Sequence, residues 1–211
     1  MTIAVGDRIP EVDVRVIREG AQAVIPSTEV LGSGRVVLFA VPGAFTPGCH
    51  KQHLPGFVSQ AAEISANGVD SIVCIGVNDA FVMDAWGTVQ GVGDSILMVA
   101  DPAADFAKAI GMEVDASGAG LGIRSQRYAM VIEDGVVTAF MPEEGGFKIE
   151  ASTADCVLTS LKSICYGQRV FTAEFLLHPA LGCQLLAGLA QGRVDLQTGY
   201  LKLPLQGKQT T

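Results

Sequence analysis

Short apolar runs alternate with amphipathic stretches along most of this chain. Val12–Val16 alternates apolar and polar residues, which predicts a half-exposed strand or hairpin within residues 1–31. Three apolar runs rich in β-branched residues predict buried strands, over Val36–Val41, Ser71–Val77 and Ile96–Val99. We expect Val36–Val41 to be the central strand of a sheet.

Four helices are predicted between and after these strands, over Pro47–Asn67, Asn78–Gln90, Asp101–Ile110 and Ser152–Ile164. Pro55 lies inside the first of them and should kink or interrupt it, since proline has no N–H to donate. Asp101 followed by proline should open the third helix. Ser152 should cap the last helix, with Asp155 at its third position.

Asp134-Gly135 predicts a tight hairpin turn between the strands Arg127–Glu133 and Val136–Met141. Strands that alternate with helices, followed by a hairpin and a closing helix, indicate an α/β fold with a sheet covered on both faces. We therefore expect one domain over residues 1–164 and a C-terminal extension over residues 165–211. The extension contains an apolar, helix-compatible piece, Phe171–Ala190; it is expected to pack on the domain or fray, and the alternative is a partner-binding or oligomerising tail.

Composition narrows the class of protein. Of the 211 residues, 49% are hydrophobic and 17% are charged, which is typical of a globular chain with a generous core. No apolar run is long enough to span a membrane, and MTIAVGDRIP does not resemble a secretory signal, so we expect a cytoplasmic protein. The net charge of −8 comes from 10 basic and 20 acidic residues before position 165, and from 4 basic and 2 acidic residues after it. This acidic body argues against nucleic-acid binding.

The five cysteines do not form a recognisable disulfide or zinc pattern. Their number is odd, their spacing is irregular, and no C-x-x-C pair occurs. His50 and His53 lie close to Cys49, but the three offer no fourth ligand or nearby carboxylate for a metal site. We therefore expect no bound metal, and we interpret the two histidines as partly exposed polar residues.

Cys49 occupies the most informative position of the chain. The sequence VPGAFTPGC runs from the end of the central strand through a Pro-Gly break, and Thr46-Pro47 is typical of a helix start. Cys49 is therefore predicted in the first helical turn, where free backbone N–H groups and the positive end of the helix dipole favour an anion. A thiol in that position should react as a thiolate nucleophile.

Pro42, Thr46 and Cys49 also fit the P-x-x-x-T-x-x-C signature of peroxiredoxins, and VPGAFTPGCHKQHLPGF resembles the type II, peroxiredoxin 5-like group. The segments GVNDAFVM, LGIRSQRYAM and VIEDGVV follow in the family's order, and the resemblance extends from about residue 3 to about residue 162. It implies a thioredoxin-like fold, in the peroxiredoxin variant. It also implies an antioxidant thiol peroxidase that reduces hydrogen peroxide and small alkyl hydroperoxides without a bound cofactor.

The resemblance assigns roles to four residues. Cys49 would attack the peroxide and become a sulfenic acid, while Thr46 would accept the peroxide's hydrogen and Pro42 would shield the sulfur from water. The family's active-site arginine is matched by Arg127, directly before the apolar strand. Arg124 is the alternative, and is otherwise interpreted as a surface charge on a loop.

The thiol that resets Cys49 could come from this chain or from an external reductant. Plant-like members carry a cysteine at the position of Cys74, although buried strand cysteines are as often inert. The animal-type resolving cysteine, expected near Ala151-Ser152, is absent. Cys156 and Cys165 are interpreted as structural, and Cys183 has no assigned role. An external reductant is therefore expected, either glutathione with glutaredoxin, or thioredoxin.

Two expectations concern the neighbourhood of Cys49. Gly48 and His50 replace residues more usual beside the family's cysteine; His50 could add positive charge or alter the surface on which the reductant docks. Type II relatives commonly form homodimers near the active site, and Phe45 and Phe81 could contribute, or could equally be buried in the core.

The competing interpretation of the whole chain is a non-turnover redox sensor or chaperone-like protein, which would be oxidised once and then stop.

Overall fold

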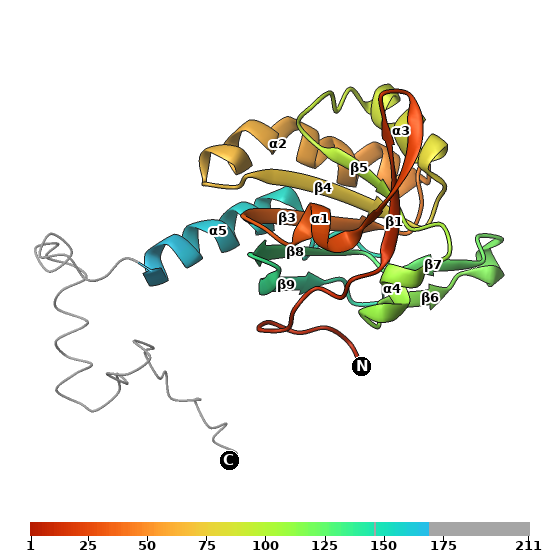
Figure 1. The fold of residues 1–211 in the computed structure, drawn as a ribbon. Coiled ribbons are helices and arrows are strands. Elements are labelled where there is room, and N and C mark those ends of the chain that lie inside the picture. Colours follow the sequence, from red (N-terminus) through yellow and green to blue (C-terminus); the bar gives the residue numbers. More distant parts are fainter. Residues whose placement is uncertain (146, 169–211) are drawn as a thin grey trace, which may run out of the picture. The chain divides into compact units, whose positions relative to one another are not determined.

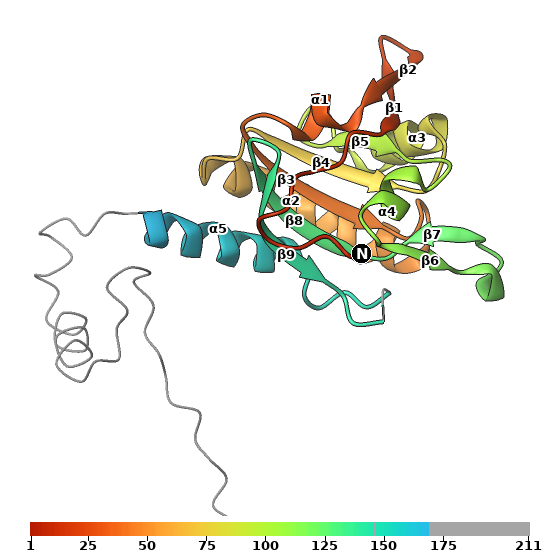
Figure 2. The same ribbon diagram turned by 60° about the horizontal axis from the view of Figure 1, so that its bottom comes forward.

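The computed structural model describes residues 1–145 and 147–168, and its centre is a mixed sheet with the strand order β2-β1-β5-β4-β3-β8-β9 (Figure 1). The strands of this sheet are β1 (Asp13–Arg18), β2 (Ala21–Pro26), β3 (Arg35–Val41), β4 (Ser71–Gly76), β5 (Leu97–Ala100), β8 (Tyr128–Glu133) and β9 (Val136–Pro142). β6 (Glu113–Asp115) and β7 (Ile123–Ser125) form a separate two-stranded arm, which lies near α4 (Figure 2). The helical elements are α1 (Ser27–Leu31), the π-helical turn η1 (Cys49–His53), α2 (Leu54–Ala66), α3 (Ala80–Gln90), α4 (Asp105–Ala109), the short 3₁₀ turn η2 (Ser117–Ala119) and α5 (Ala154–Gln168).

The central strand β3 divides the core into two layers. It pairs in parallel with β4 and antiparallel with β8, so both of its neighbours shield it. Val37, Phe39 and Val41 point to the face covered by α2, α3 and α5, whereas Val36, Leu38 and Ala40 point to the face covered by α1 and α4. This alternation confirms the α/β class with helices on both faces of the sheet, and it fits the thioredoxin-like fold.

Most predicted elements are present within one or two residues of their expected ends. The alternating segment at the N-terminus forms the β1–β2 hairpin. The hairpin turn after β8 is also as predicted, since Asp134 and Gly135 both have a positive φ, of 48° and 78°. Local turn chemistry therefore determines these elements.

Two helix starts were predicted incorrectly. Asp101 does not open α4; its buried carboxylate accepts hydrogen bonds from the backbone N–H groups of Phe106 and Ala107, so it caps α4 from a preceding turn. Ser152 does not cap α5; Thr153 does so, because its side-chain oxygen accepts from the N–H of Cys156. The N–H groups at the start of α4 are thus satisfied by Asp101 from outside the helix, and one at the start of α5 is satisfied by the residue after Ser152.

The helical segment that follows Cys49 continues through Pro55, but it changes from a π-helical turn to an α-helix just before this residue, so the predicted interruption is a wide turn and not a break. The helical segment starts at Pro47, widens into η1, and continues as α2 through Ala66. The wide turn is marked by a bond from the Leu54 N–H to the Cys49 carbonyl, five residues back. Pro55 then lies in the first turn of α2, where its missing N–H costs little.

The predicted boundary after Ile164 lies within α5, which ends at Gln168. Most of the predicted extension, including Phe171–Ala190 and Cys183, lies outside the described residues, and so does the side chain of Cys165. None of the helices within residues 1–145 and 147–168 has the length and hydrophobicity that crossing a membrane requires.

Candidate active site

Cys49 lies at the carboxyl end of β3, beyond a loop that turns the chain into η1. Its side chain is fully buried, in the core layer that also contains Phe39 and Phe57. Arg127 directly precedes β8, the antiparallel neighbour of β3, so it lies beside the end of β3. Its Nη2 donates a hydrogen bond to the Cys49 Sγ over 3.3 Å. The structure thus brings together two predicted residues that are far apart in the sequence.

Arg127 is buried as well, with only 3% of its surface exposed. Its Nη1 donates to the Nδ1 of His53 over 2.9 Å, whereas its Nε–H has no hydrogen-bond partner. A buried guanidinium with one free N–H retains donor capacity for a group that enters the site.

Arg124, the alternative cation, has a different position. It extends from β7, and its Nη1 donates to the carbonyls of Val77 (3.0 Å) and Pro42 (3.4 Å). Its Nε donates to the carbonyl of Leu121. Arg124 is therefore a part-buried brace for the active-site loop and not the surface charge proposed as its other interpretation.

The loop before Cys49 is held by side-chain contacts. Thr46 donates its hydroxyl hydrogen to the Gly43 carbonyl over 2.8 Å, which leaves its oxygen lone pairs able to accept. Asn78 accepts from the Ala44 N–H over 2.9 Å. A Cβ atom at Gly43 would lie 2.9 Å from the Arg124 Nη1, so glycine allows this close approach. Pro42 is buried beside these residues.

His53 is buried, which corrects the expectation that it is partly exposed. Only 2% of its surface is accessible, and its Nε2 lies 2.8 Å from the Ser152 carbonyl oxygen. Burial and the adjacent Arg127 charge lower the pKa of His53 to about 4, against the raising effect of its Ser152 hydrogen bond and of the Glu143 charge. The imidazole is therefore neutral at physiological pH.

Glu143 completes this buried polar group. Its Oε1 accepts from the backbone N–H groups of Glu150, Ala151 and Ser152, and from the Ser152 hydroxyl, all within 2.9 Å. Burial raises the pKa of Glu143, but these hydrogen bonds outweigh it, so the net shift is downward. The carboxylate is thus stabilised as an anion.

His50 lies at the rim of the site and contacts α3. Trp86 donates its indole N–H to the His50 Nδ1 over 3.1 Å, and Phe45 stacks on the imidazole at 5.7 Å. The Nε2 of Gln90 lies 2.8 Å from the same nitrogen. These contacts hold His50 against α3, and its contribution of positive charge or to reductant docking stays a prediction.

Gly48 also has a steric function beside Cys49. A Cβ atom there would lie 3.2 Å from the Ile149 Cδ1 and 3.5 Å from the Arg127 Nη2. The absence of a side chain leaves space in which these two groups approach the turn closely.

Cys74 lies on β4, fully buried in the same core layer as Cys49. Burial, with a smaller contribution from Cys49, raises the pKa of the Cys74 thiol well above its usual value. It is therefore a thiol, and a poor nucleophile, in this conformation. Cys156 is partly exposed on α5 and donates to the Glu150 carbonyl. Whether either cysteine has a catalytic role stays a prediction.

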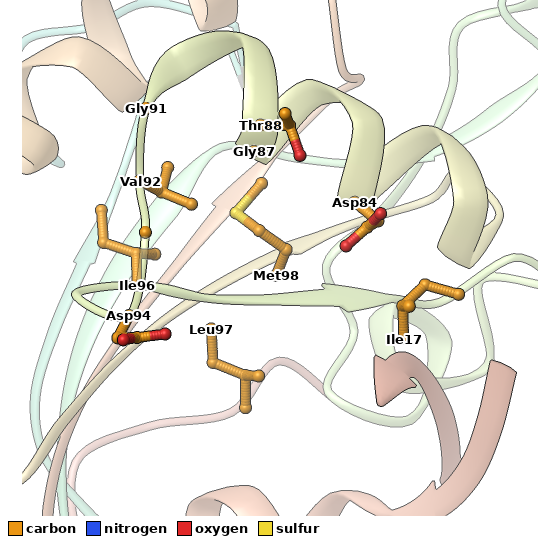
Figure 3. A pocket seen from close by; sticks show the side chains of 11 residues that line it. Ile17, Asp84, Gly87, Thr88, Gly91, Val92, Asp94, Ile96, Leu97 and Met98 are labelled. Atoms are coloured by element: carbon orange, nitrogen blue, oxygen red, sulfur yellow. The ribbon is translucent and has the colours of Figure 1, made fainter. Parts of the chain in front are cut away.

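A groove of about 680 Å³ lies elsewhere, between α3 and β5 (Figure 3). Its lining includes Ile17, Asp84, Leu97 and Met98, and none of the predicted catalytic residues. In the described part of the chain, no three His, Cys, Asp or Glu side chains gather as a metal site would require.

Sequence reasoning missed His53, Glu143 and Asn78 as residues that support the site. His53 lies four positions after Cys49, a spacing that places two residues near the same side of a helix, and this signal was available. Asn78 lies in the GVNDAF segment, directly after a predicted strand, where loop side chains often bear on a site. The contact of Glu143 with Ser152 had no local signal.

The Redoxin family model matches residues 4–158 of the chain. The chain is 44% identical over 165 residues to peroxiredoxin-2E-2, chloroplastic, of Oryza sativa subsp. japonica, which covers 76% of this chain and 73% of that protein. It is 41% identical over 160 residues to peroxiredoxin-2B of Arabidopsis thaliana, with 75% and 98% covered.

Solved structures agree with these sequence matches. Reduced Prx3 of Vibrio vulnificus, in complex with H₂O₂, has 45% identity and a TM-score of 0.72, with 76% of this chain and 99% of that chain covered. Peroxiredoxin 5 of Alvinella pompejana has 35% identity and a TM-score of 0.67, with the same shares covered.

Proposed function

The chain belongs to the redoxin family as a peroxiredoxin of the type II, peroxiredoxin 5-like group, and from this premise we propose that Cys49 is its peroxide-reducing nucleophile. Peroxiredoxins are thiol peroxidases, so the protein is an oxidoreductase that acts on a peroxide. We propose hydrogen peroxide and small alkyl hydroperoxides as substrates, and glutathione with glutaredoxin, or thioredoxin, as the source of reducing thiol.

The observation that carries the proposal is the buried contact between the Arg127 Nη2 and the Cys49 Sγ, at 3.3 Å. A guanidinium at this distance stabilises the thiolate that attacks the peroxide. The unpaired Nε–H of the same guanidinium is available to donate to a peroxide oxygen. One cation then serves both the nucleophile and the charge that develops on the substrate.

The proposed step oxidises sulfur by two electrons. The Cys49 sulfur forms a bond to the nearer peroxide oxygen, the O–O bond breaks, and the other oxygen leaves as water or an alcohol after taking a proton. Thr46 accepts a hydrogen bond from the peroxide, since its own hydrogen is donated to Gly43. The Cys49 backbone N–H donates to a peroxide oxygen, and Pro42 limits access of water.

Recycling then requires an external thiol. Its sulfur attacks the Cys49 sulfenic acid, which gives a mixed disulfide and water, and a second thiol releases the reduced Cys49. Cys74 is a poor candidate for this attack, because it lies within the sheet and burial raises its pKa. We therefore propose a one-cysteine cycle that needs no metal or bound cofactor.

Turnover of hydrogen peroxide with glutathione–glutaredoxin and with thioredoxin, each with its reductase, tests the proposal. Cys49→Ser should abolish peroxide consumption, while Cys74→Ser and a chain ending at Gln168 should turn over like the full chain. EDTA should not change the rate. Failure of the full chain to lose one thiol to one equivalent of peroxide at neutral pH would contradict the proposal. A single oxidation without turnover would instead indicate the redox sensor.

We further propose a cytoplasmic homodimer. Phe45 and Phe81 are 48% and 62% exposed, so they are available for an interface. Sedimentation of the full chain and of Phe81→Ser should give a dimer and a weakened dimer, respectively. A monomer in both samples would contradict the dimer, and cell fractionation tests the location.

A further inference from the structure

The groove between α3 and β5 has an apolar floor, and its lining includes none of the residues of the Cys49 site (Figure 3). Ile17, Leu97 and Met98 are half-buried in it, so their side chains still present apolar surface to solvent. A Cβ atom at Gly87 would lie 2.8 Å from the Met98 Cγ, so glycine at this position of α3 leaves room for the flexible methionine. The floor can therefore adapt to an apolar side chain that enters from outside.

The sheet is open on the side of β5 that faces β1. These two strands are joined at one residue pair, Arg15 with Ala100, whereas β1 and β2 are paired along six residues. Continuing the antiparallel register from Arg15 would place Ile17 opposite Met98, but that pair is not formed, and both residues line the groove. In the described part of the chain, this stretch of the β5 edge therefore has no strand partner. An open edge of this kind can pair with an added strand.

Two carboxylates flank the apolar floor. Asp84 on α3 and Asp94 in the loop after it lie on either side of Met98 (Figure 3). Both residues are exposed, and within residues 1–145 and 147–168 neither carboxylate takes part in a hydrogen bond or an ion pair. The lining includes no lysine, arginine or histidine, and Arg18 at the end of β1 is paired with Glu29. The groove thus presents uncompensated negative charge on both sides of an apolar surface.

We propose that this groove docks an extended segment of a partner protein in which two basic residues flank an apolar one. The backbone of the segment would pair with the open edge of β5, and every second side chain would then point into the groove. An apolar side chain would cover Met98, while lysine or arginine side chains on either side of it would approach Asp84 and Asp94. The groove therefore recognises a basic-apolar-basic pattern at alternate positions of a strand.

Binding of a labelled peptide to the full chain tests the proposal. The probe is fluorescein-labelled Gly-Arg-Thr-Leu-Thr-Arg-Gly, followed by fluorescence anisotropy, and a control peptide carries glutamate in place of both arginines. The groove variants are Asp84→Asn, Asp94→Asn and their combination. Asp13→Asn, which changes an exposed carboxylate outside the groove, is the matched control. The melting temperature and peroxide turnover of each variant should equal those of the natural chain.

Each single groove variant should weaken peptide binding by about twofold to fivefold, and the double variant by about fourfold to 25-fold, as expected for the loss of exposed ion pairs. Added salt should weaken binding to the natural chain more than to the double variant. Asp13→Asn should bind the probe like the natural chain, and the glutamate peptide should not bind. Equal weakening by Asp13→Asn and by the groove variants would overturn the proposal, because it would show a general attraction to an acidic protein.

Two other results would assign the groove to a different occupant and overturn the proposal. If the probe dissociates a dimer in sedimentation, the groove belongs to a second copy of the chain. If the probe binds a chain ending at Gln168 but not the full chain, the groove belongs to the segment 169–211. Cys49→Ser should bind the probe like the natural chain, so failure of docking and failure of the proposed peroxidase function are separate outcomes.

Discussion

Acidification between pH 7 and pH 4.5 should destabilise this protein through His53. The folded state holds His53 neutral with a pKa of about 4, compared with an ordinary value of 6.5. The unfolded chain therefore takes up a proton below pH 6.5, which the folded chain does not take up until about pH 4. The contribution of His53 to the free energy of unfolding is fully present above about pH 6.5, and it is lost as the pH falls from 6.5 towards 4.

The magnitude follows from the two pKa values. A difference of one pKa unit corresponds to about 1.4 kcal/mol, so the full window accounts for about 3.5 kcal/mol and the part above pH 4.5 for about 2.5 kcal/mol. This is a substantial fraction of the ~5–15 kcal/mol by which domains are stable. The histidine is almost fully buried, so solvent does not screen the effect.

Urea unfolding followed by circular dichroism at pH 7.5, 6.5, 5.5 and 4.5 measures this loss, with His53→Leu as the comparison. Asp101 and Glu143 also have shifted pKa values, raised by burial in Asp101 and lowered overall by hydrogen bonds in Glu143. Both carboxyl groups are present in the natural chain and in His53→Leu, so their effects cancel when the unfolding free energies of the two proteins are subtracted. The free energy of unfolding should therefore fall more steeply with acid in the natural chain than in the variant. Parallel curves would refute the reasoning, because His53 would then titrate alike in the folded and unfolded states.

Three further changes test individual contacts. Arg127→Gln removes the charge 3.3 Å from Cys49 and should lower kcat/KM for peroxide by about 10-fold to 150-fold in a coupled assay; a rate within twofold of the natural one would contradict the role of the cation. Arg124→Ala removes the hydrogen bonds to the carbonyls of Pro42 and Val77, and it should lower both the melting temperature and kcat/KM, the latter by about 10-fold. Unchanged values would show that the loop before Cys49 keeps its conformation without Arg124. Trp86→Phe removes the donor to His50 and should cost about 1 kcal/mol in urea unfolding, whereas no cost would mean that water replaces the indole.

Local signals were sufficient for much of the fold and for the core of the site. The Asp134-Gly135 turn and the apolar β3 run depend on neighbouring residues alone, and so does the helix start before Cys49. The choice of Arg127 over Arg124 came from a family resemblance and not from spacing. The structure places Arg127 against the sulfur, while its catalytic role awaits the kinetic test.

The errors occurred where the partner is distant in sequence. Ser152 looks like a helix cap, but the carboxylate of Glu143 binds its hydroxyl, so the cap passes to Thr153. His53 resembles a surface histidine, yet η1 faces the core at its last residue and buries it against Phe39. The contact of Glu143 with Ser152 depends on which elements the tertiary fold brings together, and no local pattern encodes it. For His53, the spacing of four residues from Cys49 was a local signal, but it does not identify the buried partner.

The bond between Trp86 and His50 gives this protein an internal optical probe. Trp86 is the only tryptophan among 211 residues, so all indole fluorescence of the chain arises at this one place. Its indole N–H is donated to the residue next to Cys49, and an excited indole responds strongly to the polarity and protonation of its partner. A rearrangement of the turn Cys49–His53 that breaks this hydrogen bond should therefore change the emission. Intrinsic fluorescence thus offers a measurement beside the sulfur that needs no label.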